Sequence, residues 1–225
     1  VVHHRLHAGD LGAGDALERL TARDKSLALI PALATSWAAT SATTWRFNLR
    51  RGVLFHDGTP FTADDVVFSI ERAQLASSNF KVFATPLGKP RKVDDYTVEL
   101  ELPRALPEAV LLENANTIFI MSRAWSARNG AGRPQDFKTG EETFASRNAN
   151  GTGPYVLQKR EAEVATVLRR NPRWWGWSEK RSGNVDEVIW LAIRSDATRL
   201  AALISGEVDM VLDPPIPDVA RLKNE

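Results

Sequence analysis

The sequence predicts an α/β fold in which a mixed β-sheet is packed with helices, and three patterns lead to that prediction. Apolar and polar residues alternate from Trp45 to Leu49, which is the period of a half-buried strand. A helix begins near Thr62 and carries apolar residues at helical spacing. Residues 188–193 are almost continuously apolar, as expected of a strand that is covered on both faces.

The elements before the alternating strand are weakly marked. Residues 1–14 are polar and glycine-bearing, so we expect a loop or a weak strand there. Residues 15–22 predict a short helix that carries two leucines. Residues 38–44 are small and polar, and predict a turn immediately before the strand.

The passage from the strand into the helix is strongly marked. Residues 57–60 read Asp-Gly-Thr-Pro and predict a turn, because Gly58 adopts positive φ cheaply and Pro60 cannot continue a strand ladder. Thr62 stands three residues before Asp65, a weak form of the capping box, and acidic residues are favourable at a helix N-terminus.

The middle of the chain mixes clear and unclear segments. Residues 76–91 contain two prolines and a glycine and predict a loop. Residues 94–102 alternate cleanly and predict a strand. A short helix is expected at 106–114 and a buried strand at 117–121, whereas the polar segment 130–150 predicts a mobile loop.

The last third contains marked turns, strands and helices. Gly151 and Gly153 suit a close approach of backbone to backbone. Asp196 is expected to cap a helix that stops at Gly206. Further strands are expected at 155–157, 163–169 and 207–211, and further helices at 196–204 and 218–224.

Composition excludes several kinds of function. The chain has 225 residues, of which 43% are hydrophobic and 25% charged, as in an ordinary globular protein. Lys and Arg total 29 against 28 Asp and Glu, so no excess charge would recruit nucleic acid or an acidic membrane. The absence of cysteine excludes disulfides, thiolate catalysis and Cys-based metal sites. No apolar run reaches the ~18 residues of a membrane span.

Several segments, taken together, resemble one known family. Residues 45–69 read WRFNLRRGVLFHDGTPFTADDVVFS, and the order aromatic strand, Gly-Val-x-Phe-His-Asp-Gly-x-Pro-Phe, Asp-Val is similar to the signature of the family 5 extracellular solute-binding proteins. Members of this family are receptors that feed peptides, nickel chelates and related solutes to ABC importers. Further matching tracts, in the family's own order, are 31–37 (PALATSW), 151–155 (GTGPY), 171–177 (NPRWWGW) and 205–210 (SGEVDM).

The resemblance implies the first lobe of a type II periplasmic-binding-protein-like fold. Residues 1–20 would form the first part of the lobe I core, 21–157 a family-specific subdomain, and 158–225 the return into the core. Nothing in the sequence corresponds to a second lobe, so we expect a fragment or a truncated relative. Because such receptors close two lobes around a solute, one lobe alone is expected to bind peptides weakly or not at all.

The function that the resemblance implies is solute capture outside the cytoplasmic membrane and delivery to the permease subunits of an ABC importer. Peptides are the expected cargo, without catalysis, cofactor, metal, nucleic acid or membrane insertion. By register with relatives, the expected solute contacts are Arg5, His7, Phe80, Phe83 and Asn116.

Two other classes of function stay open. One is a hydrolase that uses the pair His56–Asp57, although no nucleophile motif accompanies it and a turn explains both residues. The other is a sensory or scaffold module that reuses the lobe without transport.

Three further patterns have a structural and a functional interpretation. His3, His4 and His7 could bind a metal, but a solvated terminus explains them. The tryptophans at 174, 175 and 177 could form a stacking platform, but packing at a corner explains them better. Neighbouring carboxylates such as Asp64–Asp65, Asp94–Asp95 and Glu141–Glu142 fit helix capping and turns. The tract 151–154 lacks the Lys and the helix of a phosphate loop.

Overall fold

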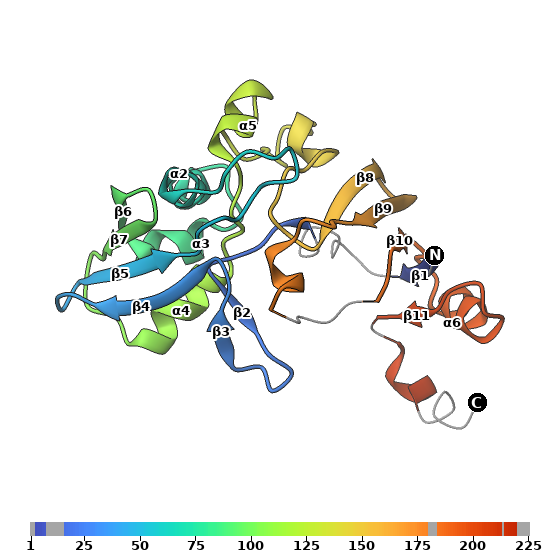
Figure 1. Cartoon of the computed structure of the whole chain (residues 1–225). Coiled ribbons are helices and arrows are strands. Elements are labelled where there is room, and N and C mark those ends of the chain that lie inside the picture. The colour runs from blue at the N-terminus through green and yellow to red at the C-terminus, as the bar shows by residue number, and fades with distance from the viewer. Residues whose placement is uncertain (1–2, 8–15, 180–183, 213, 220–225) are drawn as a thin grey trace.

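A computed structural model describes residues 3–7, 16–179, 184–212 and 214–219, with the backbone alone for 3–7. The fold is α/β with a mixed sheet, as predicted, and Figure 1 shows two main sheets side by side, each with its own helices. The larger elements are α2 (Ala63–Gln74), α4 (Glu108–Asn116), α5 (Arg123–Arg128) and α6 (Asp196–Ile204), with a four-residue helix α3 (Lys81–Ala84).

The first sheet is antiparallel and contains four strands in the order β4-β5-β7-β6. Its central strand β5 pairs Phe47 with Val98 and Trp45 with Leu100 on β7. These apolar residues share one face and are buried, because side chains alternate along a strand. The strands are β4 (Ala34–Ala39), β5 (Thr44–Leu49), β6 (Lys89–Asp94) and β7 (Thr97–Glu101).

Helix α2 packs on this sheet and begins where the capping pattern predicts. Thr62 has extended backbone angles, and its N–H donates to the Asp65 carboxylate at 2.9 Å. Val66 and Ile70 lie on the buried face of the helix. The segment from Trp45 through the turn to α2 therefore forms as predicted, with Gly58 at φ +86°.

The second sheet is mixed and contains five strands in the order β11-β1-β10-β9-β8. Strand β1 is parallel to both β10 and β11, whereas β8, β9 and β10 are antiparallel neighbours. The strands are β1 (His3–His7), β8 (Tyr155–Glu161), β9 (Ala165–Arg170), β10 (Glu187–Leu191) and β11 (Met210–Val211), and a separate hairpin joins β2 (Thr21–Arg23) and β3 (Leu29–Pro31).

The predicted helix at 15–22 is wrong from residue 17 onward, since only residue 16 of its described part is helical. Residues 17–19 are irregular and Thr21–Arg23 forms β2. The carbonyls of Arg19 and Leu20 accept hydrogen bonds from residues 32–34, more than ten residues away. This long-range pairing replaces the local bonds that a helix would need.

The predicted loop at 76–91 is also wrong, because it contains α3, a 3₁₀ turn at Thr85–Leu87 and the first half of β6. Strand β6 lies at a sheet edge, where Pro90 is tolerated. Gly88 has φ +67°, and a Cβ there would lie 2.0 Å from the Glu101 carbonyl oxygen. The proline and glycine therefore mark a strand edge and a close approach rather than a loop.

Other boundaries differ by smaller amounts. The strand expected at 94–102 begins at Thr97, because Asp94 ends β6 and residues 95–96 form the turn between the two strands. The helix expected at 106–114 is α4, two residues later. Residues 117–121 are irregular rather than a strand, although Ile118 and Ile120 are buried as predicted.

In the last third, the cap of α6 is Ser195 and not Asp196, since the Ser195 hydroxyl accepts the Thr198 N–H. Strand β10 is not covered on both faces: Val188 is buried, whereas Ile189 and Trp190 are half-buried. The strand expected at 207–211 is limited to β11. A 3₁₀ turn occupies Ile216–Asp218, and residues 220–224 of the last predicted helix lie outside the described residues.

Candidate functional site

We call the part of the fold around the four-stranded sheet and the part around the five-stranded sheet its two halves. A cavity of about 540 Å³ is lined by residues from both halves. Its walls come from the C-terminal half of α2, residues 77–80, residues 118–121, parts of the segment 134–150, and strands β8 and β9. This volume is in the range that proteins use for small ligands. Ten of its 24 lining residues carry a hydroxyl or amide group, and three are phenylalanines, at 80, 119 and 137.

The structure places the predicted solute contacts in different regions. Phe80 lines the cavity. Phe83 is on α3, 40% exposed, and outside the cavity wall. Asn116 is also outside the wall, and its carboxamide oxygen accepts a hydrogen bond from the Thr21 hydroxyl at 3.1 Å, which ties α4 to β2. Of these three predicted solute contacts, Phe80 is therefore the one that a solute in the cavity could touch.

Arg5 and His7 belong to β1, the strand between β10 and β11, with His7 opposite Leu191 and Val211. Their side chains lie outside the described part of the chain, so their role as solute contacts stays a prediction. The same holds for a metal site at His3, His4 and His7. Among the described residues, no group of three or more His, Asp or Glu could hold a metal ion.

Sequence reasoning missed Arg72, which lines the cavity from α2. Its Nε donates to the Ala131 carbonyl at 2.9 Å and one Nη to the Arg133 carbonyl at 3.1 Å. Burial lowers the pKa of the guanidinium from its ordinary value. Arg72 follows Glu71 on an otherwise amphipathic helix, and nothing in that local pattern marks it as part of a cavity.

Sequence reasoning also missed the contact between Arg19 and Phe119. The guanidinium carbon of Arg19 lies 4.1 Å from the centre of the Phe119 ring, and that ring lines the cavity. The neighbouring backbone explains the meeting, since the Ile120 N–H donates to the Glu18 carbonyl at 2.9 Å. The two residues are 100 positions apart, so no sequence spacing could have revealed the contact.

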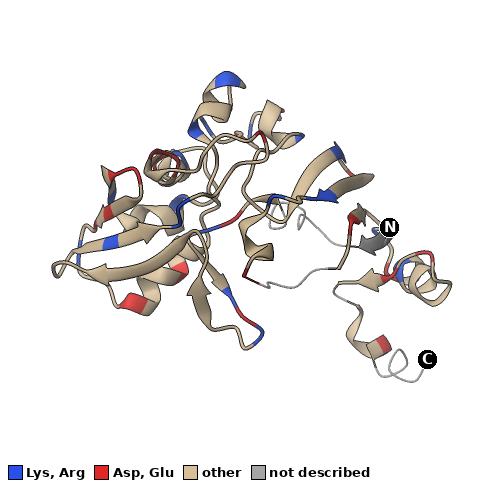
Figure 2. Cartoon of the chain, viewed as in Figure 1, with Lys and Arg blue, Asp and Glu red and all other residues tan. Residues whose placement is uncertain are grey.

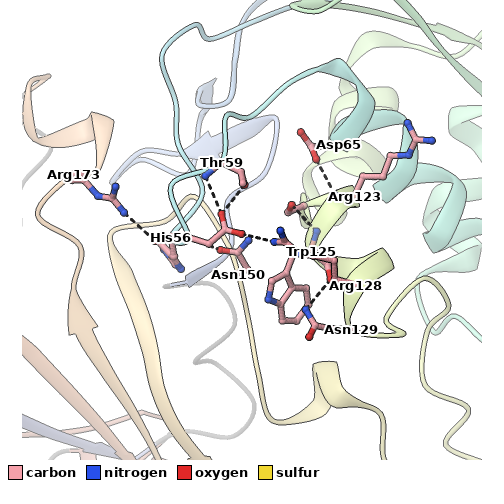
Figure 3. Close-up of polar contacts among 11 residues, drawn as sticks. His56, Thr59, Asp65, Arg123, Trp125, Arg128, Asn129, Asn150 and Arg173 are labelled. Carbon is pink, nitrogen blue, oxygen red and sulfur yellow. Dashed lines mark hydrogen bonds and ion pairs between the residues drawn. The ribbon is translucent and has the colours of Figure 1, made fainter.

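His56 and Asp57 hydrogen-bond to other segments of the chain rather than forming a catalytic pair (Figure 3). We call these contacts, together with those of residues 151–154, the joint. The Gly151 N–H donates to Nδ1 of His56 at 3.3 Å, and Nε2 lies 3.1 Å from the Gly153 carbonyl. The Arg173 guanidinium donates to the His56 carbonyl at 3.0 Å. Burial lowers the pKa of the imidazole below its ordinary value, so the ring is held neutral with both nitrogens in use.

Asp57 occupies the predicted turn. Its carboxylate accepts from the Thr59 N–H at 3.0 Å and from the Arg128 guanidinium at 2.9 Å, and its own N–H donates to Asn150 at 3.0 Å. Partial burial acts to raise the pKa of this carboxyl, but the hydrogen bonds outweigh it and hold the pKa below the ordinary value. The predicted turn at 57–60 is confirmed.

The tryptophan corner packs inside the fold. The indole N–H groups of Trp174 and Trp175 donate to the two oxygens of Glu18 at 3.0 and 2.9 Å, and Trp177 donates to the Asn171 carbonyl at 2.7 Å. All three indoles are half-buried. These contacts support the packing interpretation over a stacking platform.

The tract 151–154 holds the two halves of the fold together. A Cβ at Gly151 would lie 1.9 Å from the Ala16 carbonyl oxygen, so the close backbone approach predicted there is real. The Gly153 carbonyl accepts from His56 and also from the Asn171 amide at 3.1 Å. This places the turn after β5, the cavity wall and the corner after β9 in one hydrogen-bonded joint.

The acidic pairs elsewhere are engaged in ion pairs and helix capping, and of the residues named here Asp65 is buried. Asp64 and Asp95 both pair with Lys92, and Asp65 caps α2 and accepts the Arg123 N–H at 2.9 Å. Figure 2 shows that basic and acidic positions both occur along the ribbon in the two parts of the fold. The described part of the chain contains no helix long and apolar enough to cross a bilayer.

Comparison with solved structures defines the class of protein. The dipeptide binding protein of Pseudoalteromonas sp. SM9913, solved with Met-Leu, aligns over all of this chain and 50% of its own, with a TM-score of 0.80 and 20% identity. DppA from Helicobacter pylori, solved with the peptide STSA, aligns over all of this chain and 48% of its own, with a TM-score of 0.77 and 22% identity. The fold is that of periplasmic binding proteins, as predicted.

Sequence comparison identifies the family. The model for "Bacterial extracellular solute-binding proteins, family 5 Middle" matches residues 28–225, so the chain belongs to this family. The dipeptide-binding protein of Escherichia coli (strain K12) is 30% identical over 220 residues, covering 88% of this chain and 38% of that protein. The periplasmic oligopeptide-binding protein OppA of the same organism is 28% identical over 232 residues, covering 94% and 40%. The chain thus spans about two fifths of these relatives.

Proposed function

We propose that this chain forms part of the substrate-binding component of an ABC importer, which captures peptides or similar small solutes outside the cytoplasmic membrane and delivers them to a permease. The observation that carries the proposal is the cavity of about 540 Å³ in a chain of this family. Two relatives named as dipeptide- and oligopeptide-binding proteins support peptides as the solute class, and the name of one supports a periplasmic location.

The cavity wall suits a binding role. Hydroxyl and amide side chains provide donors and acceptors, and the aromatic rings provide apolar contact area. We propose that this wall receives one side of the solute and that a facing lobe receives the other. Closure of the two would then bury the solute. Phe80 is the predicted contact with the strongest support, and Phe83 and Asn116 have less.

The proposal makes the protein a binding component and not an enzyme. His56 would be the base of a hydrolase, but both of its ring nitrogens are committed to backbone partners at 3.1 and 3.3 Å. A general base needs a free nitrogen within hydrogen-bond reach of its substrate. The geometry therefore favours binding over hydrolysis.

Titration calorimetry tests the proposal. The protein as its gene encodes it is titrated with a library of di- to pentapeptides, and we expect saturable binding with at least one member. Binding to none of the library would overturn the peptide assignment. The 225-residue chain by itself should bind the same peptide far more weakly, and sub-micromolar binding to it would contradict a cleft shared by two lobes. Fractionation of cells that express the gene tests the extracytoplasmic location, which recovery from the cytoplasm would contradict.

A further inference from the structure

Arg19 combines a restrained guanidinium with unused hydrogen-bond donors. Its charge lies over the Phe119 ring at 4.1 Å, a cation–π contact that holds the plane of the group in place. Within the described part of the chain its guanidinium has no hydrogen-bond or carboxylate partner, and its Nε is buried without one. Burial also lowers the pKa of the group from its ordinary value.

A buried donor without a partner costs free energy, so such groups in native proteins call for an explanation. Two other arginines that stack on aromatic rings, Arg50 and Arg170, also have a hydrogen-bond or carboxylate partner. Arg50, over Trp175, donates to the Ala32 carbonyl at 3.0 Å and forms an ion pair with Glu179. The guanidinium of Arg19 stacks on the Phe119 ring in the same way, but within the described residues it has no hydrogen-bond or carboxylate partner.

The position of Arg19 indicates what could supply that partner. Arg19 itself is outside the cavity wall, but Phe119, on which its guanidinium stacks, lines the cavity, and so does Leu17. The charged side chains described in the wall itself are Arg72 and Arg160, both cationic. A guanidinium presents a planar fork of N–H donors that matches a carboxylate, and the positive field of the wall favours an anion.

We propose that Arg19 receives a carboxylate of the bound solute at the edge of the cavity, with Phe119 holding the guanidinium in position. This inference rests on the proposed function and adds a chemical class to it: the solute end that meets this wall is an anionic carboxylate and not an ammonium group. Arg19 is then a specificity-determining residue.

The test compares paired ligands on paired variants. The protein as its gene encodes it is titrated with peptides that bind, each as the free acid and as the C-terminal amide. Arg19→Met keeps a side chain of similar length over Phe119 but removes the charge. We expect it to weaken binding of the free acid about tenfold or more, since it removes a charge-assisted hydrogen bond, and to change binding of the amide less than about twofold. Arg19→Lys should fall between, because it keeps the charge and loses the fork.

Arg51→Met is the matched control. Arg51 also lies over an aromatic ring, 4.4 Å from the centre of Tyr96, but it is exposed, and Tyr96, unlike Phe119, does not line the cavity. It should leave both affinities unchanged, and melting temperatures of all variants check that the fold is intact.

The outcomes of these titrations distinguish a failure of the inference about Arg19 from a failure of the proposed function. Equal weakening of acid and amide by Arg19→Met would overturn the inference and indicate that Arg19 pairs with another part of the protein on closure. No weakening would overturn it as well, while leaving the proposed function in place. Failure of the unaltered protein to bind any peptide would overturn the proposed function and the inference with it.

Discussion

The two sheets of this protein are buried to very different degrees. Around the four-stranded sheet, 23 described hydrophobic residues form one buried cluster, whereas at the five-stranded sheet three described residues, Ala16, Leu168 and Val188, form the buried cluster. Ile189 and Trp190 on β10 remain half-buried. The difference teaches that the buried core is unevenly divided: most of it lies around the first sheet, whereas both parts of the fold contribute to the cavity wall, α2 and its neighbouring segments on one side and β8 and β9 on the other.

The largest expected effect tests that division directly. Phe47 is fully buried at the centre of the large cluster, so Phe47→Ala should lower the free energy of unfolding by about 3–5 kcal/mol. Leu168→Ala, in the small cluster, should cost about 2–3 kcal/mol, because thinner surroundings collapse more readily. Denaturant unfolding of both variants measures the two values. A larger loss for Leu168→Ala would contradict the comparison.

The next effect tests the joint between the two halves. A methyl group at Gly151 would meet the Ala16 carbonyl, so Gly151→Ala should destabilise the fold by about 1–3 kcal/mol through overpacking. Gly132 is the control, since a Cβ there meets nothing within 4 Å, and Gly132→Ala should stay within about 0.5 kcal/mol of wild type. Thermal unfolding compares them, and equal melting temperatures would show that the backbone approach at 151 is looser than described.

A smaller effect concerns the helix beside the second sheet. Ser195 caps α6 by accepting the Thr198 N–H at 3.3 Å, so Ser195→Ala should cost about 1 kcal/mol. Because α6 is outside the large cluster, we expect the loss to appear mainly as faster amide hydrogen exchange within α6. Unchanged exchange in α6 would mean that the cap contributes nothing there.

The same comparison explains how much of the fold the sequence predicts. The segment from Trp45 through α2 was predicted correctly because each junction is specified by neighbouring residues: an alternation, a turn with Gly58, and a cap at Thr62. The helix expected at 15–22 was wrong because its backbone pairs with residues 32–34 and 120, and no local pattern carries that information.

The candidate site was less predictable than the fold for the same reason. Phe80 was found through a family resemblance. Arg19, Phe119 and Arg72 were not found, because they meet only after segments about 50 to 100 residues apart are brought together. Arginines on partly polar segments are common in sequences, and Arg19 is distinctive only because its guanidinium stacks on Phe119 while its Nε is buried without a partner.

The smallest expected effect on the free energy of unfolding comes from a change of pH rather than from a substitution. It acts through His56, which belongs to the joint. The pKa of His56 lies below its ordinary value, so the unfolded chain binds a proton at this residue more readily than the folded chain. Stability therefore rises with pH between the folded and the unfolded pKa; it is complete above about pH 6.5 and declines as the pH falls below that value. A proton on Nδ1 would also oppose the Gly151 N–H, which loosens the joint where Asp57 and Arg173 lie alongside. We expect the free energy of unfolding of wild type to fall between about pH 7 and pH 5.5, and the fall to be reduced in His56→Asn, whose side chain does not titrate. The difference between the two profiles isolates His56 from the other histidines, and parallel profiles would show that its protonation is not linked to folding.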